Sequence, residues 1–337
     1  MDWAYPKEGT ERTALAIARI AEITAGLPRV TELRPADARR LIDARWAAYA
    51  RSLMTGKVSV TDHMLPLPCG PMRVRMYEVS PPRLNPRLVI FLHGGGWVMR
   101  SPETSDFVCE QLAIDLDCSI ASLDYPLAPE NPCPVAVEAC VRAIRYMAAD
   151  RDGMWPRGPY GICGESAGAN IALATIQQLK GNPVAPAAAL LVYGVYDDDH
   201  STTSHRLYGN GDFGISSADM KWYWNQYLAG SDQQMQHLAR PLRGDMRGLP
   251  PIFLACSEFD CLRDDTTRLA ARLADAGVVH ETHLMREAVH GCLNISPLFP
   301  ELSTMRHAAA RFIGAHLPQG GAGDRMQGFS QGNGQIS

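Results

Sequence analysis

The sequence predicts an α/β fold in which a mostly parallel central sheet is flanked by helices. Three short apolar runs, at residues 88–92, 159–163 and 251–257, carry this prediction. A continuous apolar run of this length is typical of a strand that is buried on both faces of a sheet. The chain has 337 residues, of which 46% are hydrophobic, and this is enough for one large domain with an attached cap.

Residues 164–168, with the sequence GESAG, lie where the strand at 159–163 should pass into a helix. The residues that follow, 169–176, are rich in alanine and leucine, which favours that helix. In a G-x-S-x-G turn between a strand and a helix, the serine hydroxyl is exposed, and the two glycines allow a close approach that larger side chains would block. We therefore expect Ser166 to be a nucleophile; the alternative is a plain glycine-rich turn.

Residues 93–97, with the sequence HGGGW, follow the strand at 88–92. Three successive glycines leave backbone N–H groups accessible, so the loop can direct amides at one developing negative charge, as an oxyanion hole requires. A phosphate-binding loop is the alternative, but no Gly-Lys-Ser/Thr follows and no G-x-G-x-x-G opens a helix. We expect His93 to shape this loop rather than to transfer protons.

A candidate acid and a candidate base follow later in the chain. Asp260 comes just after the strand at 251–257, and His290 follows residues 280–285, whose alternation predicts another strand. The chain order Ser166, Asp260, His290 is the order expected of α/β-hydrolases, and it differs from that of other serine hydrolases. We therefore predict that these three residues form a catalytic set.

The acid must be chosen among several neighbouring carboxylates. Asp260 is nearest to the carboxyl end of its strand, where α/β sheets place their functional groups. Asp264 and Asp265 fall in the first turn of the next predicted helix, where a carboxylate is favoured by the helix dipole for structural reasons. Glu258 is a weaker rival, because it lies too early along the extended chain. The prediction is therefore Asp260.

These motifs together resemble those of the hormone-sensitive-lipase group of α/β-hydrolases, the bacterial family IV esterases. The resemblance covers roughly residues 60–316, and its motifs are residues 93–97, 124–130, 164–168, 260–264 and 290–291. The chain departs from the usual family pattern at Pro126, Ala169 and Cys292. These departures leave the substrate open, because none of them falls on a candidate catalytic residue.

The resemblance implies an α/β-hydrolase fold with a helical cap, and a serine carboxylesterase that acts on short-chain esters, with aryl esters as one option. It implies that the amides of Gly95 and Gly96 belong to the oxyanion hole, to which the elbow geometry adds the amide of Ala167. It also implies a homodimer that pairs through an edge strand near residues 281–285. No metal or cofactor is needed for this chemistry.

Two other functions remain open at this point. The same residues could hydrolyse aryl amides or carbamates, because the difference lies in the leaving group and the pocket shape. A non-catalytic ligand receptor on the same fold is a remoter alternative, since such receptors lose a catalytic residue and this chain keeps a candidate for all three.

The chain divides into a core, two cap segments and a tail. We expect cap helices at 1–56, the first part of the core at 57–194, a cap insertion at 195–248 and the second part of the core at 249–318. The tail at 319–337 is rich in glycine, glutamine and serine and is predicted to be disordered.

Aromatic residues are dense in the predicted cap helix that starts after Ser216. We expect Trp222, Tyr223 and Tyr227 of this helix, together with Trp97, to line an apolar substrate pocket. The alternative is that these rings hold the cap onto the core.

Charge and composition exclude several classes of partner. The formal net charge of −4 gives no basic footprint for nucleic acid, and no apolar stretch has the length of a membrane span. The N-terminal residues lack a signal-peptide pattern, and the nine cysteines are scattered, so we expect a cytoplasmic protein with reduced thiols. The acidic residues 197–199 with His200 and His205 could suggest a metal site, but a solvated acidic loop is the favoured interpretation.

Overall fold

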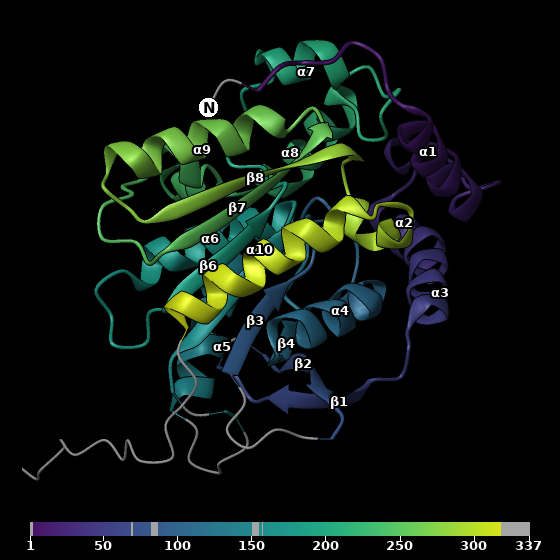
Figure 1. Cartoon of the computed structure of the whole chain (residues 1–337). Coiled ribbons are helices and arrows are strands. Elements are labelled where there is room, and N and C mark those ends of the chain that lie inside the picture. The colour runs from purple at the N-terminus through teal and green to yellow at the C-terminus, as the bar shows by residue number, and fades with distance from the viewer. Residues whose placement is uncertain (1–2, 69, 82–86, 150–154, 157, 318–337) are drawn as a thin grey trace, which may run out of the picture.

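The structure is a computed structural model that describes residues 3–68, 70–81, 87–149, 155–156 and 158–317 (Figure 1). The tail predicted to be disordered, at 319–337, lies outside the described residues.

The described residues form one sheet of eight strands in the order β1-β2-β4-β3-β5-β6-β7-β8. β1 and β2 pair with antiparallel neighbours, whereas every pairing from β4 through β8 is parallel. The prediction of a mostly parallel sheet is therefore confirmed. The strands are β1 Val58–Leu65, β2 Met72–Val79, β3 Arg87–Leu92, β4 Cys118–Leu123, β5 Tyr160–Glu165, β6 Ala188–Val192, β7 Ile252–Phe259 and β8 His280–Val289.

The central strands are buried along their whole length. Every residue of β4, β5, β6 and β7 is buried, as is all of β3 after its first residue. This burial explains why residues 88–92, 159–163 and 251–257 form apolar runs rather than alternating patterns. β1 and β8 lie at the two edges of the sheet.

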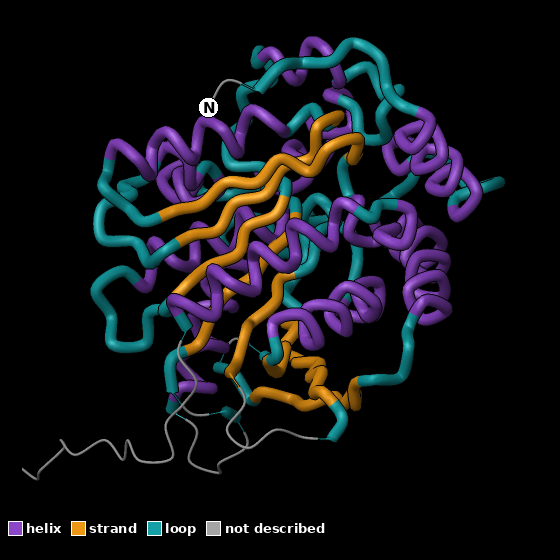
Figure 2. The backbone as a smooth tube through the Cα atoms, in the orientation of Figure 1, coloured by secondary structure: helices purple, strands orange, loops and turns teal. Residues whose placement is uncertain are grey.

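Helices cover both faces of the sheet (Figures 1 and 2). α4 and α10 pack together on the side that faces the viewer, whereas α5 and α6 pack together behind it. The core helices are α4 Asp106–Leu116, α5 Val135–Ala148, α6 Ala167–Leu179, α9 Arg263–Asp275 and α10 Glu301–His316.

The remaining helices come from the two segments that the sequence assigns to a cap. The N-terminal segment contains α1 Glu11–Ile23, α2 Pro35–Ala38 and α3 Ala44–Leu53, and the insertion contains α7 Thr203–Tyr208 and α8 Ser217–Leu228. α8 begins at the predicted cap, because the Ser216 hydroxyl accepts from the Asp219 amide while the Asp219 carboxylate accepts from the Ser216 amide. The short 3₁₀ turn Val30–Glu32 packs against α8, so the two segments meet.

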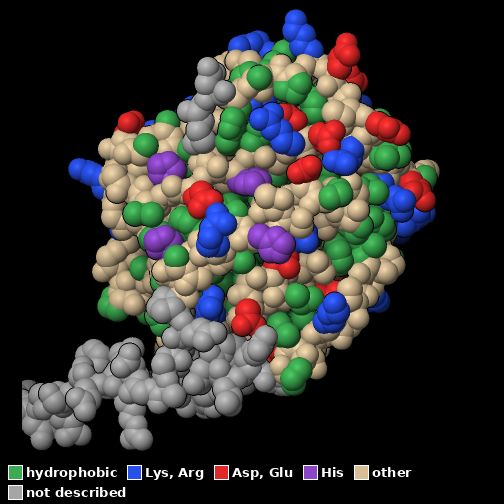
Figure 3. Space-filling view, in the orientation of Figure 1, with side chains coloured by type: hydrophobic (Ala, Val, Ile, Leu, Met, Phe, Trp, Pro, Cys, Tyr) green, Lys and Arg blue, Asp and Glu red, His purple; other side chains and the backbone are tan. Residues whose placement is uncertain are grey.

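Acidic and basic side chains are interspersed on the face of the molecule shown in Figure 3. Across the described part of the chain, we find no helix with the length and apolar character needed to span a bilayer. The eight cysteines that the structure describes are all free and buried.

Candidate active site

Ser166 lies on a sharp turn between β5 and α6. Its backbone has φ 52° and ψ −122°, a conformation that costs free energy in a residue with a side chain. A Cβ atom at Gly164 would lie 2.4 Å from the carbonyl oxygen of Gly168, and one at Gly168 would lie 2.0 Å from that of Leu92. Only glycine therefore permits this approach of helix and strands, as the GESAG pattern predicts.

The structure brings Ser166, His290 and Asp260 into one chain of hydrogen bonds. The Ser166 Oγ lies 2.9 Å from the Nε2 of His290, and the Nδ1 of His290 lies 2.7 Å from the Oδ2 of Asp260. With an ionised Asp260, Nδ1–H donates to the carboxylate, which leaves Nε2 to accept from the serine hydroxyl. A base in this position can withdraw the proton of Ser166.

The surroundings of His290 raise its pKa above the ordinary histidine value. Burial acts in the opposite direction, but the charge and hydrogen bond of Asp260, with the charge of Glu165, outweigh it. The imidazolium is therefore stabilised where a proton would arrive from Ser166.

The other carboxylates near Asp260 have structural partners. Glu258 accepts from Arg286 and from the Glu287 amide. Asp264 accepts from the Tyr5 hydroxyl, and Asp265 lies in the first turn of α9, where burial raises its pKa to about 7. None of these three contacts His290.

The glycine loop after β3 lies beside Ser166. Gly95 and Gly96 have φ of 116° and 60°, and no acceptor for their amides is found among the described residues. Ala167 is the first residue of α6, so its amide has no partner within the helix. Three free amides next to the Ser166 hydroxyl suit a developing oxyanion.

Glu165 fastens this loop to the rest of the site. Its carboxylate accepts from the Gly94 amide at 3.3 Å, from the Tyr193 hydroxyl, and from the Asn294 side chain at 3.2 Å. His93 is fully buried and stacks on Tyr125, as expected for a residue that shapes the loop. Tyr193 and Asn294 are site residues that the sequence reasoning missed, because no motif places them near Glu165.

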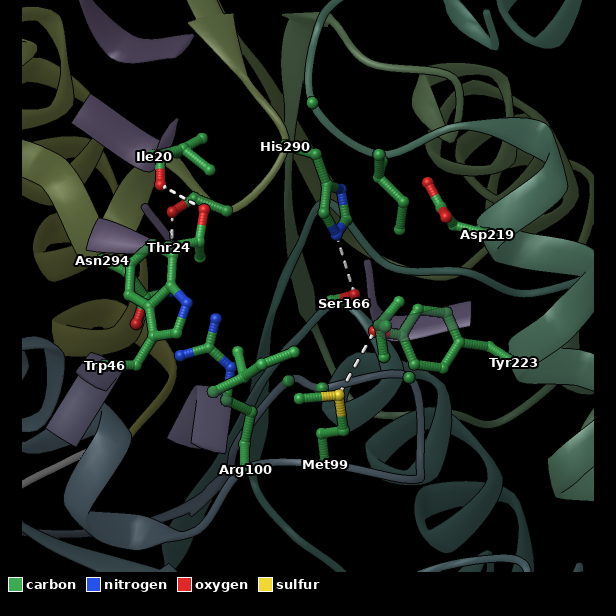
Figure 4. A pocket seen from close by; sticks show the side chains of 18 of the residues that line it. Ile20, Thr24, Trp46, Met99, Arg100, Ser166, Asp219, Tyr223, His290 and Asn294 are labelled. Carbon is green, nitrogen blue, oxygen red and sulfur yellow. Dashed lines mark hydrogen bonds between the residues drawn. The ribbon is translucent and has the colours of Figure 1, made fainter. Parts of the chain in front are cut away.

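A cavity of about 390 Å³ lies over Ser166 and His290 (Figure 4). Residues of both segments that were predicted to form a cap line it. The N-terminal segment contributes Ile20, Thr24, Leu27, Ile42 and Trp46, the insertion contributes Ile215, Asp219, Met220 and Tyr223, and the core contributes Met99, Arg100, Tyr193 and Asn294.

Of the four aromatic residues predicted to line the pocket, only Tyr223 does so. Trp97 and Tyr227 are buried and stack on each other at 4.4 Å between centroids, so they hold α8 onto the core instead. Trp222 packs against Tyr223 from outside the cavity and borders a shallow surface hollow. The prediction was wrong for these three, because the rotation of α8 and the turn at Trp97, with φ 62°, direct their rings elsewhere.

Arg100 and Trp46 are cavity residues that the sequence motifs do not identify. Trp46 lies on α3, where a buried aromatic residue equally fits simple packing. Arg100 carried a weak signal: a long cationic side chain three residues after the HGGGW loop.

The molecule has a mostly parallel sheet with helices on both faces, a serine on a strand–helix elbow, and an aspartate and a histidine at the ends of later strands. These features together define an α/β-hydrolase. The chain matches the alpha/beta hydrolase fold family over residues 89–294. It belongs to this family and, within it, to the hormone-sensitive-lipase-like (bacterial family IV) esterase group.

Similar proteins agree with this assignment. The chain is 34% identical over 252 residues to the carboxylic ester hydrolase LipN of Mycobacterium tuberculosis, an alignment that spans 72% of this chain and 66% of LipN. It is 30% identical over 280 residues to the acetyl esterase of Salmonella schwarzengrund, spanning 81% and 83% of the two chains. An esterase of the archaeon Pyrobaculum calidifontis superposes with a TM-score of 0.81 at 27% identity, covering 89% of this chain and 97% of that one.

Proposed function

We propose that this chain is a serine carboxylesterase that hydrolyses short-chain esters through Ser166, His290 and Asp260. The observation that carries the proposal is the continuous hydrogen-bonded chain from Asp260 through His290 to Ser166, at the floor of a cavity. The printed names of the relatives, carboxylic ester hydrolase and acetyl esterase, support the same reaction.

The mechanism follows from the position of each group. Ser166 Oγ attacks the ester carbonyl while His290 Nε2 takes its proton. The amides of Gly95, Gly96 and Ala167 receive the negative charge that develops on the carbonyl oxygen. His290 then returns the proton to the departing alcohol and leaves an acyl-enzyme. Water, deprotonated by His290, cleaves the acyl-enzyme and restores Ser166.

The cavity supports a short acyl chain. Its volume of about 390 Å³ is near the lower end of the usual range for small-molecule sites, roughly 300 to 1,000 Å³. Tyr223 lies directly beside Ser166, where its ring restricts the space (Figure 4). A nitrophenyl ester series should therefore peak between acetyl and hexanoyl, and a maximum on the palmitoyl ester would contradict the proposal.

A paired panel separates ester hydrolysis from the amidase and carbamatase alternatives. Aryl esters, matched anilides and matched carbamates are given to the wild type and to Ser166→Ala. We expect the esters to be cleaved far faster than the anilides and carbamates, and the variant to be inactive and unlabelled by an organophosphonate. Stoichiometric labelling of Ser166→Ala would remove Ser166 from the mechanism.

We also propose a reducing compartment, the cytoplasm, because the described cysteines are buried and unpaired. Cell fractionation with an antibody to the chain tests this. Recovery outside the cytoplasmic fraction would refute it.

A further inference from the structure

Arg100 lines the cavity beside the glycine loop. A Cβ atom at Gly95 would lie 2.5 Å from the Cγ of Arg100, so the arginine stem covers one of the candidate oxyanion residues. Its guanidinium is 4.2 Å from the centroid of the Trp46 ring, and Figure 4 shows the two side chains together at one wall of the cavity. The cation is thus held in place by an aromatic ring rather than by a carboxylate.

The guanidinium has no polar partner in the described part of the chain. Its side chain makes no hydrogen bond or ion pair there, and its Nη1 atom is buried without an acceptor. A buried donor of a charged group that has no hydrogen bond costs free energy, and such groups are normally paired in folded proteins. Nε and Nη2, which also have no partner among the described residues, are the donors that a molecule in the cavity can use.

None of the nearby carboxylates that the structure describes accepts a hydrogen bond from the guanidinium. Asp43 uses its Oδ2 to accept from the backbone amide of Arg100 while its Oδ1 is buried without a partner, and Glu165 accepts from three other groups. Asp219, which also lines the cavity, is bound to Ser216 in the helix cap. Burial lowers the pKa of Arg100 and the charges of Asp43 and Glu165 oppose this, but a guanidinium stays protonated in proteins.

The backbone at Arg100 is also unusual. Its φ is 78°, in the left-handed region that glycine adopts readily and arginine does not. Such strain tends to persist at ligand-binding sites, where the side chain has a use. Both the unmade hydrogen bonds and the strained backbone indicate that Arg100 binds a ligand.

We propose that Arg100 binds a free carboxylate on the ester substrate, so that the preferred substrates are esters that carry a second, ionised carboxyl group. This rests on the proposed esterase function. The planar guanidinium matches a carboxylate through two parallel N–H···O bonds. The substrate class includes half-esters of dicarboxylic acids and esters of carboxylated phenols.

Two isosteric pairs of substrates test this with the full chain. One pair is monomethyl glutarate and its analogue with a carboxamide in place of the carboxylate; the other is 4-acetoxybenzoate and 4-acetoxybenzamide. We expect kcat/KM to favour the carboxylate member of at least one pair by about tenfold to a hundredfold, as for hydrogen bonds to charged groups. Equal values within both pairs would overturn the proposal.

Two variants assign the preference to Arg100. Arg100→Met removes the charge, and Arg100→Gly removes it while suiting the positive φ, so the second should fold even if the first does not. The carboxylate preference should vanish in both. Arg45→Met is the matched control, because Arg45 is exposed on α3, outside the cavity, and its removal changes the net charge equally. A preference that survives in Arg100→Gly, or that is lost in Arg45→Met, would contradict the assignment.

Binding to Ser166→Ala separates this proposal from the esterase proposal. Calorimetry should show tighter binding of 4-acetoxybenzoate than of 4-acetoxybenzamide, and the difference should disappear in Ser166→Ala/Arg100→Gly. If 4-nitrophenyl acetate is not hydrolysed by the wild type, the esterase proposal fails whatever this binding shows. If it is hydrolysed and neither pair shows a preference, only the carboxylate proposal fails.

Discussion

Asp260 holds His290 with one carboxylate oxygen and its own loop with the other. Its Oδ2 lies 2.7 Å from the His290 Nδ1, and its Oδ1 accepts from the Leu262 amide at 2.8 Å. The carboxylate is buried and cannot turn without losing one of these bonds. The tautomer and orientation of His290 are therefore set by the short segment that connects β7 to α9.

Replacing Asp260 with asparagine should reduce kcat by at least about a hundredfold. The Leu262 amide needs the acceptor oxygen, so the asparagine NH₂ group would face His290 Nδ1 and favour the wrong tautomer. Steady-state kinetics on a nitrophenyl ester measures the loss, with circular dichroism to verify folding.

Asp265→Asn is the control for that variant. Both backbone amides that Asp265 binds, those of Tyr196 and Asp197, donate to its Oδ2, and one amide oxygen can accept both. We expect less than about a tenfold loss of kcat, because Asp265 does not contact His290. A folded but inactive Asp265→Asn, together with an active Asp260→Asn, would require the acid to be reassigned.

Removing the charge of Glu165 should shift the acid limb of the pH–rate profile. Activity requires neutral His290, whose pKa is raised above its ordinary value of about 6.5, so kcat/KM should fall as the pH drops through that raised value. The charge of Glu165 contributes to the rise. Glu165→Gln removes that charge and should move the acid limb to lower pH.

The Glu165→Gln profile is compared with that of Glu281→Gln, which removes a partly exposed carboxylate on β8. The acid limb of Glu281→Gln should lie at the same pH as that of the wild type. An unmoved limb in Glu165→Gln would contradict the contribution of the Glu165 charge, and a flat wild-type profile down to pH 5 would argue against His290 as the base.

The sequence predicted the parts of the site that depend on local geometry. The elbow at Ser166 and the loop at Gly95 and Gly96 follow from short patterns in which glycine is required by close backbone contacts. The central strands were predicted correctly because parallel strands that are buried on both faces tend to be continuously apolar. Asp260 was found because it follows such a strand, whereas His290 follows the edge strand β8, which was predicted from its alternating pattern.

The cavity wall could not be predicted in the same way. Trp222, Tyr223 and Tyr227 lie on one helix, and only its rotation against the core decides that Tyr223 faces Ser166. Trp46 lies 120 positions before Ser166 in the sequence, so its place at the cavity depends on tertiary packing. Arg100 became informative only once its missing partners and positive φ were visible.

The edge position of β8 leads to a prediction on assembly. β8 pairs with β7 on one side, and its residues 281–284 are partly exposed. An unpaired strand edge tends to be covered, and pairing with a second copy would cover it. Light scattering at micromolar concentration should give the mass of a dimer, and a monomer mass would contradict this.

Gly96 should tolerate no side chain, for a reason that a double variant can isolate. A Cβ atom at Gly96 would lie 2.2 Å from the Tyr223 ring, whereas its φ of 60° is one that alanine adopts at modest cost. Gly96→Ala should therefore displace its amide or the Tyr223 ring and lower kcat about a hundredfold, as for the loss of one oxyanion donor. The measurement is kcat on a nitrophenyl ester with folding verified.

Adding Tyr223→Ala removes the colliding ring and should recover about tenfold or more of kcat relative to Gly96→Ala alone, because the two positions are in direct contact. Gly95 provides the matched comparison. A Cβ atom there would lie 2.2 Å from the backbone oxygen of Met99, and φ is 116°, so Tyr223→Ala should not rescue Gly95→Ala. Equal rescue of both glycine variants, or of neither, would show that the Tyr223 ring is not what forbids a side chain at Gly96.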